Sequence, residues 1–216
     1  GNWNGTRGTL TLEPLGMPGW RLQHPSQLAW RDGAFSLSEL CLTAGDPLLC
    51  ITAKQDKAGN LDAGYRLRGL PLALLLNAAG ESGLPLRVDG SLHGDGQLRR
   101  NADGAISGKA SIGSDHGSVT WIEHPDAPLL GYDGFALNAV LGANGQHLGL
   151  HANLDHGGSL DGQASLSGRQ QALAGQLDLH LNNLAFLELL GNTLANVHGQ
   201  ARGNFRLGGT LARPAI

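Results

Sequence analysis

The amino-acid sequence predicts an all-β fold, a long, curved and mainly antiparallel sheet folded into an open groove with an apolar interior. Glycine accounts for 34 of the 216 residues, which is about twice its usual share. Apolar and polar residues alternate along many short segments, as they do on strands that bury one face. Asp-Gly and Asn-Gly steps separate several of these segments, as expected for hairpin turns.

Composition limits the classes of function and suggests how the chain is organised. The formal net charge is −3 and the 15 Lys and Arg residues are scattered, which argues against nucleic acid as a partner. The longest apolar run, Leu70–Leu76, is shorter than the roughly 18 residues needed to cross a bilayer. We expect one elongated β-groove domain over residues 1–216. Because the chain starts at Gly1 without Met, we also expect it to be a piece cut from a longer protein.

The first hairpin can be drawn in register around Asp-Gly at residues 32–33. With these two residues as the turn, Trp30 faces Phe35. Leu28 then faces Leu37, and both pairs fall on the same side of the sheet, as a buried face requires.

The next hairpin contains both cysteines of the chain, in the segment ELCLTAGDPLLCI. If Gly-Asp at residues 45–46 forms the turn, Cys41 faces Cys50. A zinc site would need more ligands and a CxxC redox motif another spacing. A structural disulfide is therefore favoured over two reduced cysteines, and it points to an oxidising compartment such as a bacterial periplasm.

Further strands follow at intervals of roughly ten residues, which favours antiparallel neighbours. Alternation is clearest over residues 106–112, 148–154 and 177–181. Two short helices are predicted, over residues 71–79 and 184–190. They belong to a weak internal repeat that relates residues 64–98 to residues 178–207, and such a repeat suggests a sheet extended by repetition.

Two short helices cannot cover the apolar face of about a dozen strands. The sheet must therefore curl to bury that face against itself, or the face must hold an apolar guest. By strand-face parity, the residues expected to line the groove are Leu28, Trp30, Phe35, Leu37, Leu67, Ile106, Ala110, Ile112, Leu137, Leu148, Leu150, Leu154, Leu160, Leu166, Leu177, Leu179, Leu181, Phe205 and Leu207.

The sequence contains no motif that predicts catalysis. His147 and His151 are the most suggestive of the nine histidines, but on a strand they lie about 13 Å apart, too far to share a zinc ion. The nucleophile-elbow, phosphate-loop and dinucleotide signatures are missing. We therefore expect no enzyme activity, no cofactor and no metal, and a secreted β-helical adhesin or lyase is the weaker alternative.

Three segments together resemble the C-terminal region of the TamB family. They are Trp20-Arg21-Leu22, the two-cysteine segment, and the closing pattern G-x-x-x-G-x-x-x-L-G-G-T-L-x-x-P over residues 199–214. The resemblance covers nearly the whole chain. Its specific parts are the cysteine segment and the closing pattern, since the strands between them are generic.

This resemblance implies a place and a function. TamB proteins are anchored in the inner membrane by an N-terminal helix, span the periplasm and work with TamA, an outer-membrane barrel of the Omp85 family. They are grouped with AsmA-like and chorein-like bridge proteins, whose grooves are thought to carry phospholipids between membranes. The expected partners are thus phospholipid acyl chains, a TamA-like barrel and nascent outer-membrane proteins. The alternative is a chaperone or scaffold for outer-membrane barrels and autotransporters that conducts no lipid.

Overall fold

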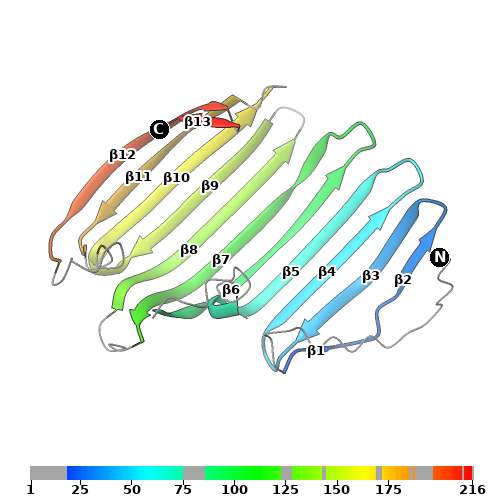
Figure 1. The fold of residues 1–216 in the computed structure, drawn as a ribbon, viewed down its shortest axis with the longest axis horizontal. Coiled ribbons are helices and arrows are strands. Elements are labelled where there is room, and N and C mark those ends of the chain that lie inside the picture. Colours follow the sequence, from blue (N-terminus) through cyan, green and yellow to red (C-terminus); the bar gives the residue numbers. More distant parts are fainter. Residues whose placement is uncertain are drawn as a thin grey trace.

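The computed structural model describes residues 19–74, 86–122, 128–142, 145–168, 172–184, 187, 197–210 and 212–215. These residues form one open sheet in which every neighbouring pair of strands is antiparallel (Figure 1). From β3 to β13 the strands lie in the order of the chain, as successive hairpin connections require. The predicted all-β, antiparallel fold is confirmed.

The strands and the 3₁₀ turn η1 have the following bounds. They are β1 (Arg21–Leu22), β2 (Leu28–Arg31), β3 (Ala34–Thr43), β4 (Leu48–Gln55), β5 (Leu61–Pro71), β6 (Leu86–Arg100), β7 (Ile106–Trp121), β8 (Pro128–Gly142), β9 (Gly145–Leu154), η1 (Asp155–Gly157), β10 (Gly158–Ser167), β11 (Ala172–Leu181), β12 (Ala201–Thr210) and β13 (Arg213–Ala215). Strands β1 and β2 pair with different parts of the same edge of β3.

The longest connections between strands lie at one end of the sheet. At the other end, which we call the short-turn end, residues 32–33, 56–60 and 101–105 join successive strands (Figure 1, upper right). At the opposite end, the long-connection end, residues 72–85 and 182–200 join β5 to β6 and β11 to β12.

The hairpin drawn from the sequence is confirmed. Asp32 and Gly33 have φ values of 51° and 80°, the positive values that a tight two-residue hairpin turn requires. Trp30 pairs with Phe35 and Leu28 with Leu37. The two aromatic rings stack with their centroids 5.9 Å apart.

Strands β6, β7 and β8 contain 15, 16 and 15 residues, and are longer than the sequence pattern suggested. Register shifts interrupt them between Gly90 and His93 and between Asp133 and Ala136. A bulge inserts residues that break strict alternation. The period-2 pattern therefore revealed only part of each of these strands.

The predicted helices are described only in part. Residues 72–74 are helical, but Pro71 is the last residue of β5, so this helix begins one residue later than predicted. The Leu187 N–H donates to the Leu184 carbonyl at 2.9 Å. The remainder of both predicted helices lies outside the described residues.

A buried cluster covers part of one face at the long-connection end. Trp20, Leu70 and Leu92 are its buried members, and Leu72 and Leu74 from the helical segment pack against them. A short apolar helix has little stability alone and must pack on another element. Here it packs on the sheet.

Candidate functional site

The backbone register assigns the paired strand residues to two faces. Directly paired residues of antiparallel strands point to the same side of a sheet, so the pairs can be followed from strand to strand. One such row, which we call the central row, consists of Leu42, Leu49, Leu67, Gly94, Ile112, Leu137, Leu150, Gly162, Leu177 and Phe205. It crosses the sheet from β3 to β12 without a polar side chain.

The neighbouring row faces the other way and is mostly polar. It consists of Cys41, Cys50, Arg66, Asp95, Ser111, Asn138, Gly149, Gln163, Gln176 and Arg206. We call the side with the central row the apolar face and the side with this row the polar face.

The register places all of the groove residues expected from parity on the apolar face. That this face binds lipid stays a prediction. The parity list omitted other members of the face, although several of them share the parity of a listed residue on the same strand, as Tyr65 does with Leu67. The omitted members are Leu40, Leu42, Leu49, Ile51, Tyr65, Leu98, Leu141 and Leu173.

The apolar face is covered at one end and open at the other. Its buried residues Leu70, Leu92 and Leu181 lie toward the long-connection end. By contrast, Trp30 is 71% exposed and lies close to the short-turn end. Leu148, near the middle of β9, is 40% exposed. A sheet face that leaves such side chains in water is typical of a surface that binds an apolar partner.

Two tyrosines lie within the apolar face without making it polar. The Tyr65 ring covers Gly96, whose missing side chain leaves the necessary space, and its hydroxyl donates to the Ser111 carbonyl at 3.0 Å. Burial raises the pKa of Tyr65, and the Asp95 carboxylate adds to the rise, so the phenol stays neutral. The Tyr132 ring similarly lies against Gly117, and its hydroxyl bonds with Ser114.

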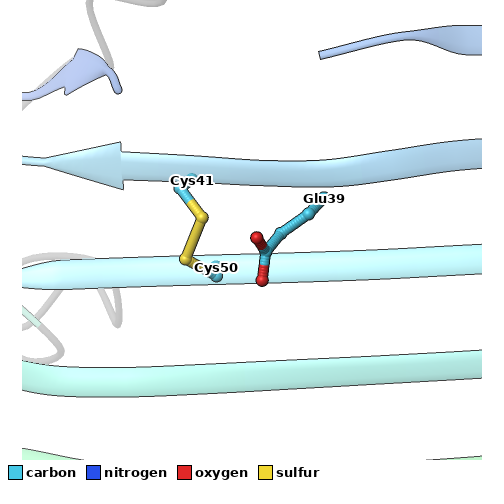
Figure 2. A group of neighbouring side chains, drawn as sticks. All are labelled: Glu39, Cys41 and Cys50. Atoms are coloured by element: carbon cyan, nitrogen blue, oxygen red, sulfur yellow. A yellow bond between two sulfur atoms is a disulfide. The ribbon is translucent and has the colours of Figure 1, made fainter. Parts of the chain in front are cut away.

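The polar face carries the disulfide. Cys41 on β3 pairs with Cys50 on β4, and their sulfurs are bonded (Figure 2), which confirms the staple predicted from the sequence. The Glu39 carboxylate lies beside the sulfurs, within 4.8 Å. Bonded sulfurs are not thiolates and so are poor metal ligands. Glu39 is already paired with Arg66, so this cluster serves as a cross-strand staple beside an ion pair.

Removing the staple should weaken this corner of the sheet. We expect Cys41→Ser/Cys50→Ser to lower the free energy of unfolding by about 2.5 to 3 kcal/mol, because a cross-link around a loop of about ten residues restricts the unfolded chain. Urea unfolding followed by circular dichroism measures the change. Wild-type protein in dithiothreitol should match the variant, and equal midpoints for oxidised protein and variant would contradict the prediction.

Hollows on the polar face lie between charged and amide side chains. One of about 600 Å³ is bordered by Arg66, His93 and Asp95. Of the suggestive histidine pair, His151 binds Asp161, with Nδ1 2.6 Å from the carboxylate oxygen. Side chains of neighbouring strands are therefore joined by ion pairs and hydrogen bonds on the polar face.

The comparisons with known proteins give the family. The family model described as TamB, N-terminal domain, matches residues 1–216. The chain belongs to the TamB family. The match is to the N-terminal domain, which corrects the expected placement in the C-terminal region. Glycine-spaced strands such as the closing pattern can recur anywhere along a repetitive sheet, so that pattern did not fix the position. No curated protein and no solved structure matched the chain.

The family match covers the apolar face, the disulfide and the described helical segment alike, since it extends over the whole chain. Within the described residues, no helix has both the length and the apolar character needed to span a bilayer.

Proposed function

We propose that this chain is a non-enzymatic periplasmic segment of a TamB-like envelope bridge, and that its apolar face carries phospholipid acyl chains between the inner and outer membranes. The central row supports the proposal most directly, because it is apolar at every strand from β3 to β12. Each methylene that such a surface removes from water contributes about 0.8 kcal/mol.

Passage along this face would be passive. The central row runs across the strands, and each step of about 4.8 Å to the next strand meets similar chemistry. Neighbouring positions thus bind an acyl chain with similar affinity, and the barrier between them is low. Direction would be set by the two membranes, not by this segment.

The compartment and the partners follow from chemistry and family. A disulfide persists in oxidising compartments, so the Cys41–Cys50 bond supports a periplasmic location. As in the TamB family, we propose that the parent protein works with a TamA-like Omp85 barrel and supports assembly of outer-membrane proteins. The AsmA-like and chorein-like bridge proteins would share its mode of transport.

Site-specific photo-crosslinking tests lipid carriage. A photoreactive residue at Leu150, in the central row, should capture phospholipid when the full-length protein is expressed in a bacterial envelope. The same residue at Gly149, on the polar face of the same strand, should not. Mass spectrometry of the crosslinked protein identifies the adduct. Equal lipid capture at both positions, or none at Leu150, would reject the proposal.

A second candidate is a scaffold for outer-membrane protein strands, and the edge of β12 favours it. Among the described strands, β13 pairs with the outer edge of β12 only over residues 208–210. Unpaired strand edges add strands from other chains. Crosslinkers on residues 201–207 should then capture unfolded barrel precursors, whereas lipid capture at Leu150 with no precursor at this edge would reject the scaffold.

A further inference from the structure

One charged residue stands apart from the rest. We compared the strand residues that have a register partner in the structure. Among them, Arg100 is the only acidic or basic residue (Asp, Glu, Lys, Arg or His) on the apolar face. It pairs with Leu61 on one side and Ile106 on the other. Through Leu61 its row continues to Gln55 and Phe35.

Arg100 has no electrostatic partner among the described residues, although acidic groups lie at the same end of the sheet. Asp62 is bound by Arg99 at 2.6 Å, and Asp32 by Lys57 at 3.0 Å. Hydrogen bonds from Asn60 satisfy Asp56 and lower the pKa of its carboxyl. The Arg100 guanidinium is thus exposed and available to an external anion.

The position of Arg100 suits a lipid headgroup. It is the last residue of β6, at the short-turn end, where the apolar face is open. An arginine can lay its methylene stem on apolar neighbours while its charged head stays in water. Its guanidinium can donate two parallel hydrogen bonds to a phosphate, a geometry that lysine does not reproduce.

The distance to the central row suits acyl chains. Arg100 lies six residues from Gly94 on β6, which is roughly 20 Å along an extended strand. One leaflet of a bilayer contributes about 15 Å of hydrocarbon, half of the core thickness. Tails that start at Arg100 and run along β6 and β7 would therefore cover the apolar rows that lie between Arg100 and the central row.

We propose that Arg100 binds the phosphate group of a phospholipid whose tails lie along β6 and β7, so that headgroups project at the short-turn end. This inference rests on the proposed lipid function and adds a headgroup site to it. The ligand chemistry is a phosphodiester attached to an acyl-chain lipid.

The test compares Arg100→Gln with Arg99→Gln. Arg99 is the adjacent residue, lies on the polar face and is bound to Asp62, so it is a matched control. Maltoside detergent micelles loaded with phosphatidylglycerol, or with diacylglycerol, which has the acyl chains but no phosphate, supply the probes, and native mass spectrometry measures bound lipid. We expect Arg100→Gln to bind about tenfold less phosphatidylglycerol and as much diacylglycerol as wild type. Arg99→Gln should bind both lipids normally, and Arg100→Lys should recover part of the binding.

The outcomes separate this inference from the function on which it rests. If wild type binds both lipids and Arg100→Gln loses neither, the headgroup site is rejected while lipid carriage stands. If wild type binds neither lipid, both proposals are rejected. A last experiment adds inorganic phosphate to wild-type protein with bound phosphatidylglycerol. If phosphate at equal concentration displaces the lipid, Arg100 is a free-anion site and the lipid assignment is overturned.

Discussion

Replacing Leu148 with aspartate should remove most of the bound lipid from the protein. Leu148 lies on the apolar face and is 40% exposed, so the new carboxylate can stay in water while the face is empty. An acyl chain at that position would have to desolvate the charge, and a carboxylate in hydrocarbon is less stable by about 2.5 to 3.5 kcal/mol. We therefore expect roughly a hundredfold loss of affinity, measured by native mass spectrometry of lipid-loaded protein.

Val140 provides the matched control. It is 47% exposed and sits on the adjacent strand β8, but its partners Lys109 and His147 place it on the polar face. Val140→Asp should therefore bind as much lipid as wild type. Thermal unfolding of both variants checks that the sheet stays folded. Equal lipid loss in the two variants would show that lipid binding does not depend on the apolar face.

Local rules predicted the hairpins because each depends on a few adjacent residues. Asp-Gly at residues 32–33 sets a two-residue turn, and that turn alone determines that Trp30 pairs with Phe35. The cysteine pair followed in the same way from the turn at residues 45–46. Period-2 alternation then assigned residues to faces within each strand.

The remaining features depend on how strands meet, which alternation does not specify. The bulges in β6, β7 and β8 add residues whose positions depend on the partner strand. The sequence around Arg100 does not distinguish it from other charged residues, which are common at strand ends. Its place on the apolar face is shown by its pairing with Leu61 and Ile106.

Ion pairs between neighbouring strands are a feature of the polar face. Cross-strand contacts on the polar face, such as Arg99 with Asp62 and His151 with Asp161, join neighbouring strands without using the apolar surface. Each exposed pair contributes little, typically below about 1 kcal/mol. The sheet therefore depends heavily on its backbone ladder, and substitutions that disturb the ladder should have large effects.

Gly108→Ala should be among the most damaging small substitutions in the ladder. Gly108 has φ of 147°, and a Cβ there would overlap the Gln97 carbonyl oxygen of the neighbouring strand. The strained backbone and the overlap should together lower the free energy of unfolding by about 2 to 4 kcal/mol. Because β6 and β7 lie in the middle of the sheet, their separation would also break the central row between Gly94 and Ile112. Hydrogen exchange should therefore show faster exchange at the β6 and β7 amides.

Gly149→Ala on β9 separates this effect from a general intolerance of side chains at strand glycines. A Cβ at Gly149 would meet no atom within 4 Å, and its φ is not positive. Alanine restricts the unfolded chain more than glycine does, so this variant should be as stable as wild type or more stable by up to about 1 kcal/mol. If both variants were equally stable, the close approach of β6 and β7 would not limit the sheet. A loss confined to Gly108→Ala would instead show that this contact holds the two halves of the apolar face together.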